Sequence, residues 1–344
     1  MTRITIIVPT FNRLRDLEVT LDALAQQSFR AFAVVVVDNG STDGTEAAMI
    51  ARAASPGPFP LRYLRIDPSG PAGARNAGIA AATTPYLAFV DSDVSLDPAW
   101  LAIAAAALDT DPGIPAIGGA LVYANDPGYL NAFGGTISRI GLAWDIGEGE
   151  PVGVAESPAD RLWINCSAML ARSEAVRAAG GFDGRFFYGF EDSDLGWRMT
   201  IARGPLHVLP ELRALHRTGD DIGAAAAPIV FHASKNRLAS LIANASWRML
   251  AVYGPLYLSY AIVDALLRAP RRPKVAALLW NIGNLRGTIA RRRSLPVPAG
   301  GRCRAETLIA ARLFPDVRLG GMRRRPNRIQ RDAGTRIADD RVSP

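Results

Sequence analysis

The sequence predicts an α/β protein with a mostly parallel central sheet flanked by helices. Short β-branched runs alternate with amphipathic stretches over the first hundred residues, an order typical of strand–helix–strand units. Hydrophobic residues make up 49 % of the 344 residues, which is enough for a sizeable core and excludes a mostly disordered chain. The two cysteines, Cys166 and Cys303, exclude a disulfide-stabilised scaffold and a four-cysteine zinc site.

The elements of the N-terminal part follow from their periodicity. Ile4–Val8 is a β-branched run that ends at Pro9, which predicts a buried strand. Leucines recur at helical spacing in the next segment, so a helix is expected over Arg13–Gln27. The elements expected after it are strands at Ala33–Val37, Leu61–Ile66 and Tyr86–Val90, with a helix at Ala72–Ala82.

Weaker patterns predict the elements of the middle of the chain. The expected helices are Ala99–Leu108, Ser173–Ala179 and Asp192–Ala202, and the expected strands are Asn165–Ala171 and Leu206–Leu209. Residues 124–160 are rich in glycine and proline and show neither period clearly. The alternation of strands and helices therefore supports a parallel sheet chiefly through the first half of the chain.

Charge is divided unevenly along the sequence. Residues 1–234 hold 17 Arg and no Lys against 26 Asp and Glu, whereas residues 235–344 hold 22 Lys and Arg against 6 Asp and Glu. The acidic body argues against a protein that binds nucleic acid along its whole length, so no nucleic-acid partner is expected. The basic third predicts contact with an anionic surface, of which a membrane leaflet is the commonest.

An apolar stretch, Leu238–Leu267, lies within this basic third. Its cleanest part, Met249–Val263, is about 15 residues long, short of the roughly 20 that span a bilayer, and Gly254-Pro255 is expected to break it. We therefore expect residues 235–319 to form a basic, amphipathic helical region that associates with a membrane, followed by a disordered tail over 320–344. A spanning helix and a soluble helical cap are the alternatives.

The beginning of the chain shows no signal peptide, because Met1-Thr2-Arg3 runs directly into a short strand. The expected location is therefore the cytoplasm, with peripheral attachment to the cytoplasmic face of the membrane.

Polar residues follow three of the predicted strands, at 9–12, 38–41 and 91–93. In a parallel sheet, ligands bind outside the carboxyl ends of the strands, so these clusters are expected on one rim. Carboxylates such as those of Asp91-Ser92-Asp93 suit Mg²⁺ or Mn²⁺, which can in turn hold a diphosphate, although an isolated pair is more often a solvated turn.

A small-residue segment, Gly70–Gly78, precedes the last of these strands. Within it, Arg75 offers a planar fork for a phosphate or a carboxylate. The segment matches neither a Walker loop nor G-x-G-x-x-G, so a dinucleotide site is unsupported.

These motifs, in this order, resemble the family 2 glycosyltransferases, which have the GT-A nucleotide-sugar fold. The resemblance covers about residues 3–220 and implies a catalytic domain over 1–234. The matching segments are Val8–Arg13, Val37–Gly44, Gly73–Gly78, Phe89–Asp93 and Gly180–Asp183, then Gly189–Leu195 and Arg198.

The resemblance implies a donor site and a metal site at the strand ends. Asp38 would accept a hydrogen bond from the base of a nucleotide-diphosphate sugar. Asp93 would bind Mn²⁺ or Mg²⁺ directly, with Asp91 near the ribose and the metal, and with His216 completing the metal site. The whole implied donor site comprises Pro9, Thr10, Phe11, Asn12, Asp38, Arg75, Asp91 and Ser92.

The resemblance also places the catalytic base in the pair Glu191-Asp192, and Asp192 is the predicted base. Glu191 is expected beside the acceptor, as are Trp163 and Asn165, although a tryptophan is more often part of the core. The acidic cluster opens a predicted helix, where the helix dipole favours negative charge, so Asp194 is expected to serve the helix end rather than the reaction.

The predicted function is a metal-dependent, inverting glycosyltransferase that moves a sugar to a saccharide or lipid-linked acceptor. A metal would neutralise the leaving diphosphate and a carboxylate would take the acceptor proton. The sequence lacks a Gln-x-x-Arg-Trp motif, so single additions rather than processive synthesis are expected. The alternatives are a sugar-nucleotide pyrophosphorylase, disfavoured because no Lys precedes residue 235, and an inactive sugar-binding or assembly partner at the membrane.

Overall fold

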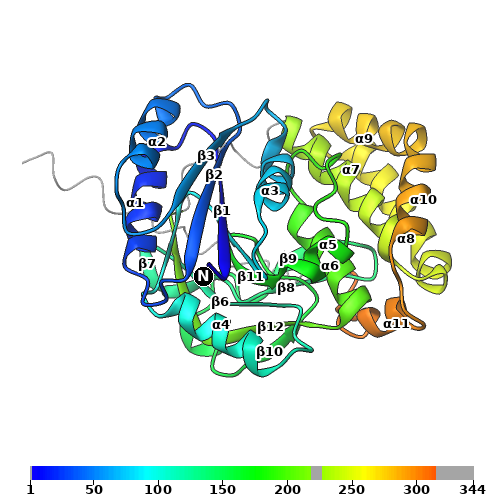
Figure 1. Cartoon of the computed structure of the whole chain (residues 1–344). Coiled ribbons are helices and arrows are strands. Elements are labelled where there is room, and N and C mark those ends of the chain that lie inside the picture. The colour runs from blue at the N-terminus through cyan, green and yellow to red at the C-terminus, as the bar shows by residue number, and fades with distance from the viewer. Residues whose placement is uncertain (1, 218–226, 315–344) are drawn as a thin grey trace, which may run out of the picture.

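The structure is a computed structural model that describes residues 2–217 and 227–314, and it confirms the α/β class. A twisted sheet runs through the molecule with helices on both faces (Figure 1). Four parallel strands form its N-terminal half in the order β3-β2-β1-β4. They are β1 (Ile4–Thr10), β2 (Phe32–Asp38), β3 (Leu61–Arg65) and β4 (Tyr86–Val90).

Beyond β4 the sheet is mixed, because β11 runs antiparallel to both of its neighbours, β4 and β6. The long strands here are β6 (Ala116–Tyr123), β11 (Ala168–Arg172) and β12 (Leu206–His216). The other strands of this part are β7 (Asp126–Ala132), which pairs with β6, and the three-residue strands β5 (Val94–Leu96) and β10 (Ala159–Arg161). The strand expected to end at Leu209 thus continues past an irregularity to His216, which brings that histidine to the site.

The region without a clear sequence pattern contains a small separate hairpin. Its strands are β8 (Gly135–Ile137) and β9 (Ala143–Asp145), and a 3₁₀ turn follows at Val152–Val154. Three-residue strands are too short to show a period of two, which explains why the sequence did not predict them.

Helices cover the sheet on both faces because alternate strand residues point to opposite sides. Ile4, Ile6 and Val8 pack with the leucines of α1 in one core cluster, and Ile7 packs with α3 in another. The helices of this part are α1 (Leu14–Ala25), α2 (Thr45–Ala54), α3 (Gly70–Ala81), α4 (Trp100–Thr110), α5 (Ser173–Ala178) and α6 (Glu191–Arg203). The sequence analysis missed α2, whose buried side is narrow, with only Thr45 and Met49 buried.

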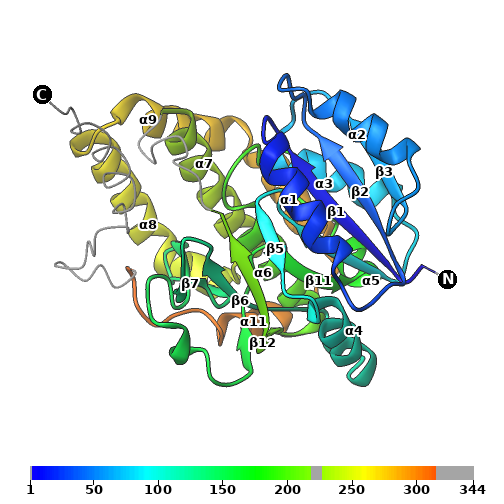
Figure 2. The ribbon, with the colours of Figure 1, turned by 90° about the vertical axis from the view of Figure 1, so that its left-hand side faces the viewer.

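The C-terminal part is helical and packs beside α6 (Figure 2). The helices are α7 (Ala227–Asn244), α8 (Trp247–Leu267), α9 (Arg271–Gly283), α10 (Leu285–Ser294) and α11 (Gly301–Glu306). The expected break at Gly254-Pro255 is wrong, since α8 continues through Pro255. The expected tail over 320–344 lies outside the described residues.

Buried polar side chains join α7 to the catalytic half. Asn236 donates from Nδ2 to the carbonyl of Gly189 at 2.7 Å, and Ser240 and Asn244 both donate to Asp194 Oδ1 at 2.8 Å. These three α7 side chains are fully buried. The helix also crosses the predicted domain boundary at 234/235, a boundary that stays a prediction.

Candidate active site

The loops after β1 and β2 are tied together at the predicted rim. Thr10 lies opposite Asp38 in the sheet register. Asn12 then donates its backbone N–H to Ser41 Oγ at 2.9 Å and accepts from the Thr42 N–H at 2.7 Å through Oδ1. Its φ of 53° is left-handed, a conformation that asparagine tolerates. These contacts leave the ring of Phe11, at the same strand end, 51 % exposed.

Asp38 is fully buried and already engaged by protein donors. Its Oδ1 accepts from the Ser41 N–H at 2.8 Å, and its Oδ2 accepts from Tyr63 Oη at 2.6 Å and Arg65 Nη1 at 3.3 Å. Burial and the hydrogen bond to Asp38 raise the pKa of Tyr63 to about 12. These contacts show that Asp38 positions the loop after β2, and its expected contact with a base stays a prediction.

Arg75, from α3, is the centre of a buried cluster of carboxylates. Its guanidinium donates to Asp91 Oδ1 at 2.8 Å, to Asp192 Oδ1 at 3.0 Å and to Glu191 Oε1 at 3.1 Å. Burial alone would lower the pKa of Arg75, but the charges of Asp192 and Asp91 raise it well above its ordinary value. The guanidinium is therefore occupied by carboxylates, contrary to the expectation that it holds the nucleotide.

The candidate bases, Glu191 and Asp192, open α6 beside Arg75. Asp192 accepts the backbone N–H of Cys166 at 3.1 Å through its second oxygen, whereas Glu191 Oε2 is buried without a hydrogen-bond partner. Burial and the charge of Asp192 raise the pKa of Glu191 to about 7, and burial also raises that of Asp192. The Asp192 side chain is 20 % exposed against 10 % for Glu191, so Asp192 is the more accessible of the two.

The third acidic residue of this turn, Asp194, is structural. Both of its oxygens are engaged, one by Ser240 and Asn244 and the other by Arg198 at 2.7 Å. It therefore anchors α6 to α7 and is not available to a substrate.

Asp93 and His216 converge as predicted, with His216 Nε2 at 3.5 Å from Asp93 Oδ1. On the other ring nitrogen, Nδ1 lies 2.8 Å from Asn131 Oδ1. Because an amide oxygen only accepts, Nδ1 carries the proton and the Nε2 lone pair can face a metal. When no metal is bound and His216 is protonated on both nitrogens, its hydrogen bond and charge, together with the charge of Arg13 at 3.0 Å, outweigh burial and lower the pKa of Asp93.

The residues of this site fit a divalent cation that takes part of its coordination from a substrate. In the described residues no group of three or more His, Cys, Asp and Glu side chains is arranged to hold a metal. Mg²⁺ is often bound through one or two protein ligands plus substrate phosphates and water, a pattern that Asp93 and His216 match.

The other residues of the Asp91-Ser92-Asp93 motif turn away from the metal pair. Asp91 accepts from Arg75 and from Ser167 Oγ at 2.6 Å, so both of its oxygens face the Arg75 cluster. Ser92 is buried, and its carbonyl accepts from Thr20 of α1 at 2.9 Å. Asp91 and Ser92 thus have protein partners, and their expected metal and donor contacts stay predictions.

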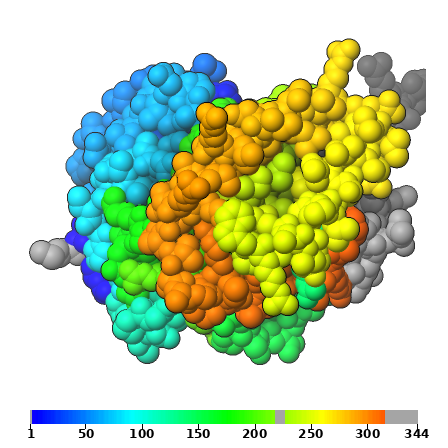
Figure 3. Space-filling model, turned by 90° about the vertical axis from the view of Figure 1, so that its right-hand side faces the viewer, coloured from blue at the N-terminus to red at the C-terminus, as the bar shows by residue number. Residues whose placement is uncertain are grey.

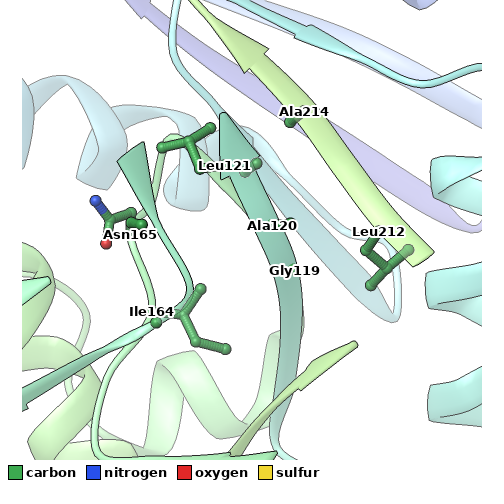
Figure 4. Close-up of a pocket in the computed structure, with 10 residues that line it drawn as sticks. Gly119, Ala120, Leu121, Ile164, Asn165, Leu212 and Ala214 are labelled. Carbon is green, nitrogen blue, oxygen red and sulfur yellow. The ribbon is translucent and has the colours of Figure 1, made fainter. Parts of the chain in front are cut away.

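The two residues expected at the acceptor have different positions. Trp163 is buried, donates from Nε1 to the Thr136 carbonyl at 3.0 Å and packs in a core cluster, so the acceptor role is wrong for it. Asn165 lines a small cavity of about 10 Å³ between β6 and β12, and its side chain is labelled in Figure 4. Its Oδ1 is buried without a hydrogen-bond partner, so it could accept from a ligand hydroxyl.

Asp145, at the end of β9, is a candidate that the sequence analysis missed. Asn165, Asp192 and His216 all lie close enough to influence its pKa. Burial and the charge of Glu148 raise its pKa to about 7, and its Oδ1 has no hydrogen-bond partner. Asp145 and Asn165 thus present unpaired oxygens beside the candidate base.

Comparisons with known proteins concern the family and the fold of this chain. Residues 5–132 match the sequence profile of the family described as Glycosyl transferase family 2. The chain is 29 % identical over 214 residues to a pre-mycofactocin glycosyltransferase of Mycobacterium tuberculosis, covering 62 % of this chain but 42 % of that protein. It is 32 % identical over 208 residues to glycosyltransferase AglE of Haloferax volcanii, covering 58 % of this chain and 64 % of that protein.

The fold is shared with solved glycosyltransferase structures. The crystal structure of GalNAc-T7 with UDP, GalNAc and Mn²⁺ superposes with a TM-score of 0.60 at 14 % identity, covering 87 % of this chain and 59 % of that one. At this identity the likeness concerns the fold alone. Residues 5–132 thus carry the profile of glycosyltransferase family 2, and the relatives together with the shared GT-A fold support a family 2 glycosyltransferase.

Proposed function

We propose that this chain is a metal-dependent, inverting glycosyltransferase that uses a nucleotide-diphosphate sugar. The main support is that the candidate metal ligands and the candidate base lie at the same rim of the sheet. Asp93 faces His216 at 3.5 Å, and Asp192 lies on the neighbouring Arg75 cluster. The family relationship and a fold neighbour holding UDP and Mn²⁺ support the donor class.

In the proposed reaction, Asp192 accepts the proton of an acceptor hydroxyl while the oxygen attacks the anomeric carbon of the donor. The bond from that carbon to the diphosphate breaks, and the product has inverted configuration. Asp93 and His216 would hold a divalent cation, whose charge would stabilise the leaving diphosphate. Arg75 is a positioning residue, because its contacts with Asp91 and Asp192 fix the carboxylate that must receive the proton.

The proposed acceptor is a saccharide or a lipid-linked saccharide, and each binding event adds one sugar. Asp145 and Asn165 are proposed to receive the acceptor, because their unpaired oxygens lie near Asp192. The proposed location is the cytoplasmic face of a membrane, where the basic C-terminal third would contact anionic lipid.

The metal proposal is tested with Asp93→Ala. Asp22→Ala is the control, because Asp22 is an exposed residue of α1 that forms a surface ion pair with Arg52. Calorimetry with UDP- and GDP-sugars and Mn²⁺ should show donor binding that Asp93→Ala weakens at least about tenfold and Asp22→Ala leaves unchanged. Donor binding that is undiminished in Asp93→Ala, or in excess EDTA, would refute the metal site.

The released nucleotide separates the alternatives. A transferase with a matched acceptor, or with water in its place, releases the nucleoside diphosphate. A pyrophosphorylase would instead consume pyrophosphate and release a nucleoside triphosphate, and an inactive binding partner would bind the donor without releasing either.

A further inference from the structure

Helices α8 and α9 expose an apolar surface that extends the proposed membrane attachment. Figure 3 shows this side of the molecule, with α8 in yellow beside α9 and α10 in orange. We call the exposed apolar residues of α8 and α9 the apolar face. Its members, each at least 39 % exposed, are Trp247, Val252, Leu256, Leu258, Ile262, Val263, Leu266, Leu267, Val275, Leu279 and Ile282. Contiguous apolar surface of this kind marks a contact with a protein or a membrane.

The other side of α8 is committed to the protein. Met249, Tyr257 and Ala265 are buried in or beside the core cluster under α8, and Tyr253 accepts from Arg139 at 2.6 Å. By length and composition α8 is the one candidate membrane span among the described residues. A spanning helix, however, needs lipid or other membrane helices around it, whereas α8 packs along one side on a core cluster that also includes residues of the sheet region and α6. The packing therefore favours a helix that lies in the membrane plane.

Basic side chains surround the apolar face. Arg248, Arg268, Arg271, Arg272 and Arg286 are exposed at the ends of α8, α9 and the turn between them. Between residues 245 and 305 the sequence has a single acidic residue, Asp264, and Lys274 pairs with it at 2.7 Å. An apolar face with a basic rim matches the headgroup region of an anionic leaflet.

A pocket of about 570 Å³ opens at the N-terminal end of α8 and extends this basic rim. Trp247 lines it together with Arg292, Arg293 and Arg302. Arg292 and Arg302 donate to carbonyls at the C-terminal end of α7, so Arg293, which is exposed, is the arginine of this pocket that adds to the rim. A tryptophan beside arginines is the composition of the membrane–water interface.

We propose that the apolar face inserts into the headgroup boundary of one anionic leaflet, with α8 lying in the plane of the membrane and not crossing it. Because Asn281 of α9 donates to the Lys235 carbonyl at 3.1 Å, and Asn236 of α7 donates to the loop before α6, this contact also fixes how the active-site rim faces the membrane.

The test uses flotation of the full chain with vesicles of phosphatidylcholine alone or with phosphatidylglycerol, at low and high salt. Binding should require phosphatidylglycerol and weaken with salt. The variant Leu279→Glu/Ile282→Glu should reduce the bound fraction at least about tenfold, because two apolar side chains leave the interface. Ile50→Glu on α2 is the matched control, since Ile50 is 55 % exposed on a different part of the surface.

Arg271→Gln/Arg272→Gln should reduce binding to the anionic vesicles and remove most of the salt dependence. Three results would overturn the proposal: equal binding by the Leu279→Glu/Ile282→Glu variant, resistance to alkaline carbonate, which indicates a span, and self-association without lipid that the same variant abolishes. Donor binding, measured in parallel, should stay unchanged in these variants, so a failed flotation would not count against the transferase proposal.

Discussion

Arg75 determines the electrostatics of the site because one buried guanidinium serves three carboxylates. Without it, Asp91, Glu191 and Asp192 would bring three negative charges into a region poor in water, and the raised pKa values of Glu191 and Asp192 would rise further. Unpaired atoms remain in this cluster, namely Arg75 Nε and Glu191 Oε2. Arg75 therefore holds the proposed base, Asp192, in place, while its own Nε and Glu191 Oε2 have no hydrogen-bond partner.

The first prediction at this scale concerns Asp192. Asp192→Asn keeps the shape of the side chain but removes the proton acceptor, so turnover should fall by at least about 10²-fold while donor affinity stays within about threefold. Initial rates with a saturating donor, together with calorimetry, measure both quantities. If Glu191→Gln is the inactive variant and Asp192→Asn turns over normally, the base is Glu191.

The second prediction concerns Asp145, which the structure adds to the site. Asp145→Asn replaces a charged hydrogen-bond acceptor, and a lost bond of this kind corresponds to roughly a tenfold rise in the acceptor KM. The donor affinity should not change, because Asp145 acts on the acceptor side in this proposal. A variant that loses donor affinity and keeps its acceptor KM would assign Asp145 to the donor instead.

Among the elements, α7 depends on arginines beyond its own end. Arg292 donates to the carbonyls of Ile242 at 2.9 Å and Ala245 at 2.6 Å, and Arg302 donates to those of Ala243 and Asn244 at 2.6 Å each. The last carbonyls of a helix lack partners within it and carry its negative dipole end. Part of the basic charge of the C-terminal third is therefore structural and does not face a membrane.

The prediction for this element compares two neighbouring arginines. Arg292→Gln should lower the free energy of unfolding by about 1–3 kcal/mol, since buried carbonyls lose their donor. Arg293→Gln is the control, because Arg293 is exposed, and its effect should stay within about 0.5 kcal/mol. Urea denaturation followed by circular dichroism measures the free energy of unfolding of both variants. Equal effects would show that the hydrogen bonds from Arg292 to the end of α7 do not stabilise the protein.

At the scale of the whole molecule, the catalytic half and the helical part are joined through α7. A chain that ends at the predicted boundary, residue 234, would lack Asn236, Ser240 and Asn244. Asp194 and the carbonyls of Tyr188 and Gly189 would then lose their donors. Buried polar groups without partners are costly, and the loop that leads into α6 would lose its support.

The prediction is that residues 1–234 alone do not form a stable catalytic domain. This fragment should bind no donor and should bind a dye specific for exposed apolar surface, whereas residues 1–314 should melt cooperatively and bind the donor. Size-exclusion chromatography and calorimetry on the two fragments test this. A monomeric 1–234 fragment with full donor affinity would instead establish the predicted domain boundary.

The sequence by itself determined the features that depend on neighbouring residues. The β-branched runs predicted β1 and β2, short apolar runs predicted β3 and β4, and the leucine spacing predicted α1, because these patterns are local properties. The polar clusters at the strand ends follow from the same reasoning, since parallel strands bring their carboxyl ends to one edge. Asp93 and His216 were also predicted, though only through the family resemblance, and the structure brings them together.

Only the tertiary structure decided which partners these side chains take. The sequence suggested that Arg75 binds a phosphate or a carboxylate, because a guanidinium group can pair with either anion. Its partners in the structure include Glu191 and Asp192, which lie more than a hundred positions away in the sequence. Asp145 lies on a three-residue strand without a pattern of its own. Continuity of α8 through Pro255 was likewise hidden, because packing along the helix outweighs the one hydrogen bond that proline removes. Long-range packing and the burial of charge have no local signature, and these two effects set the chemistry of the site.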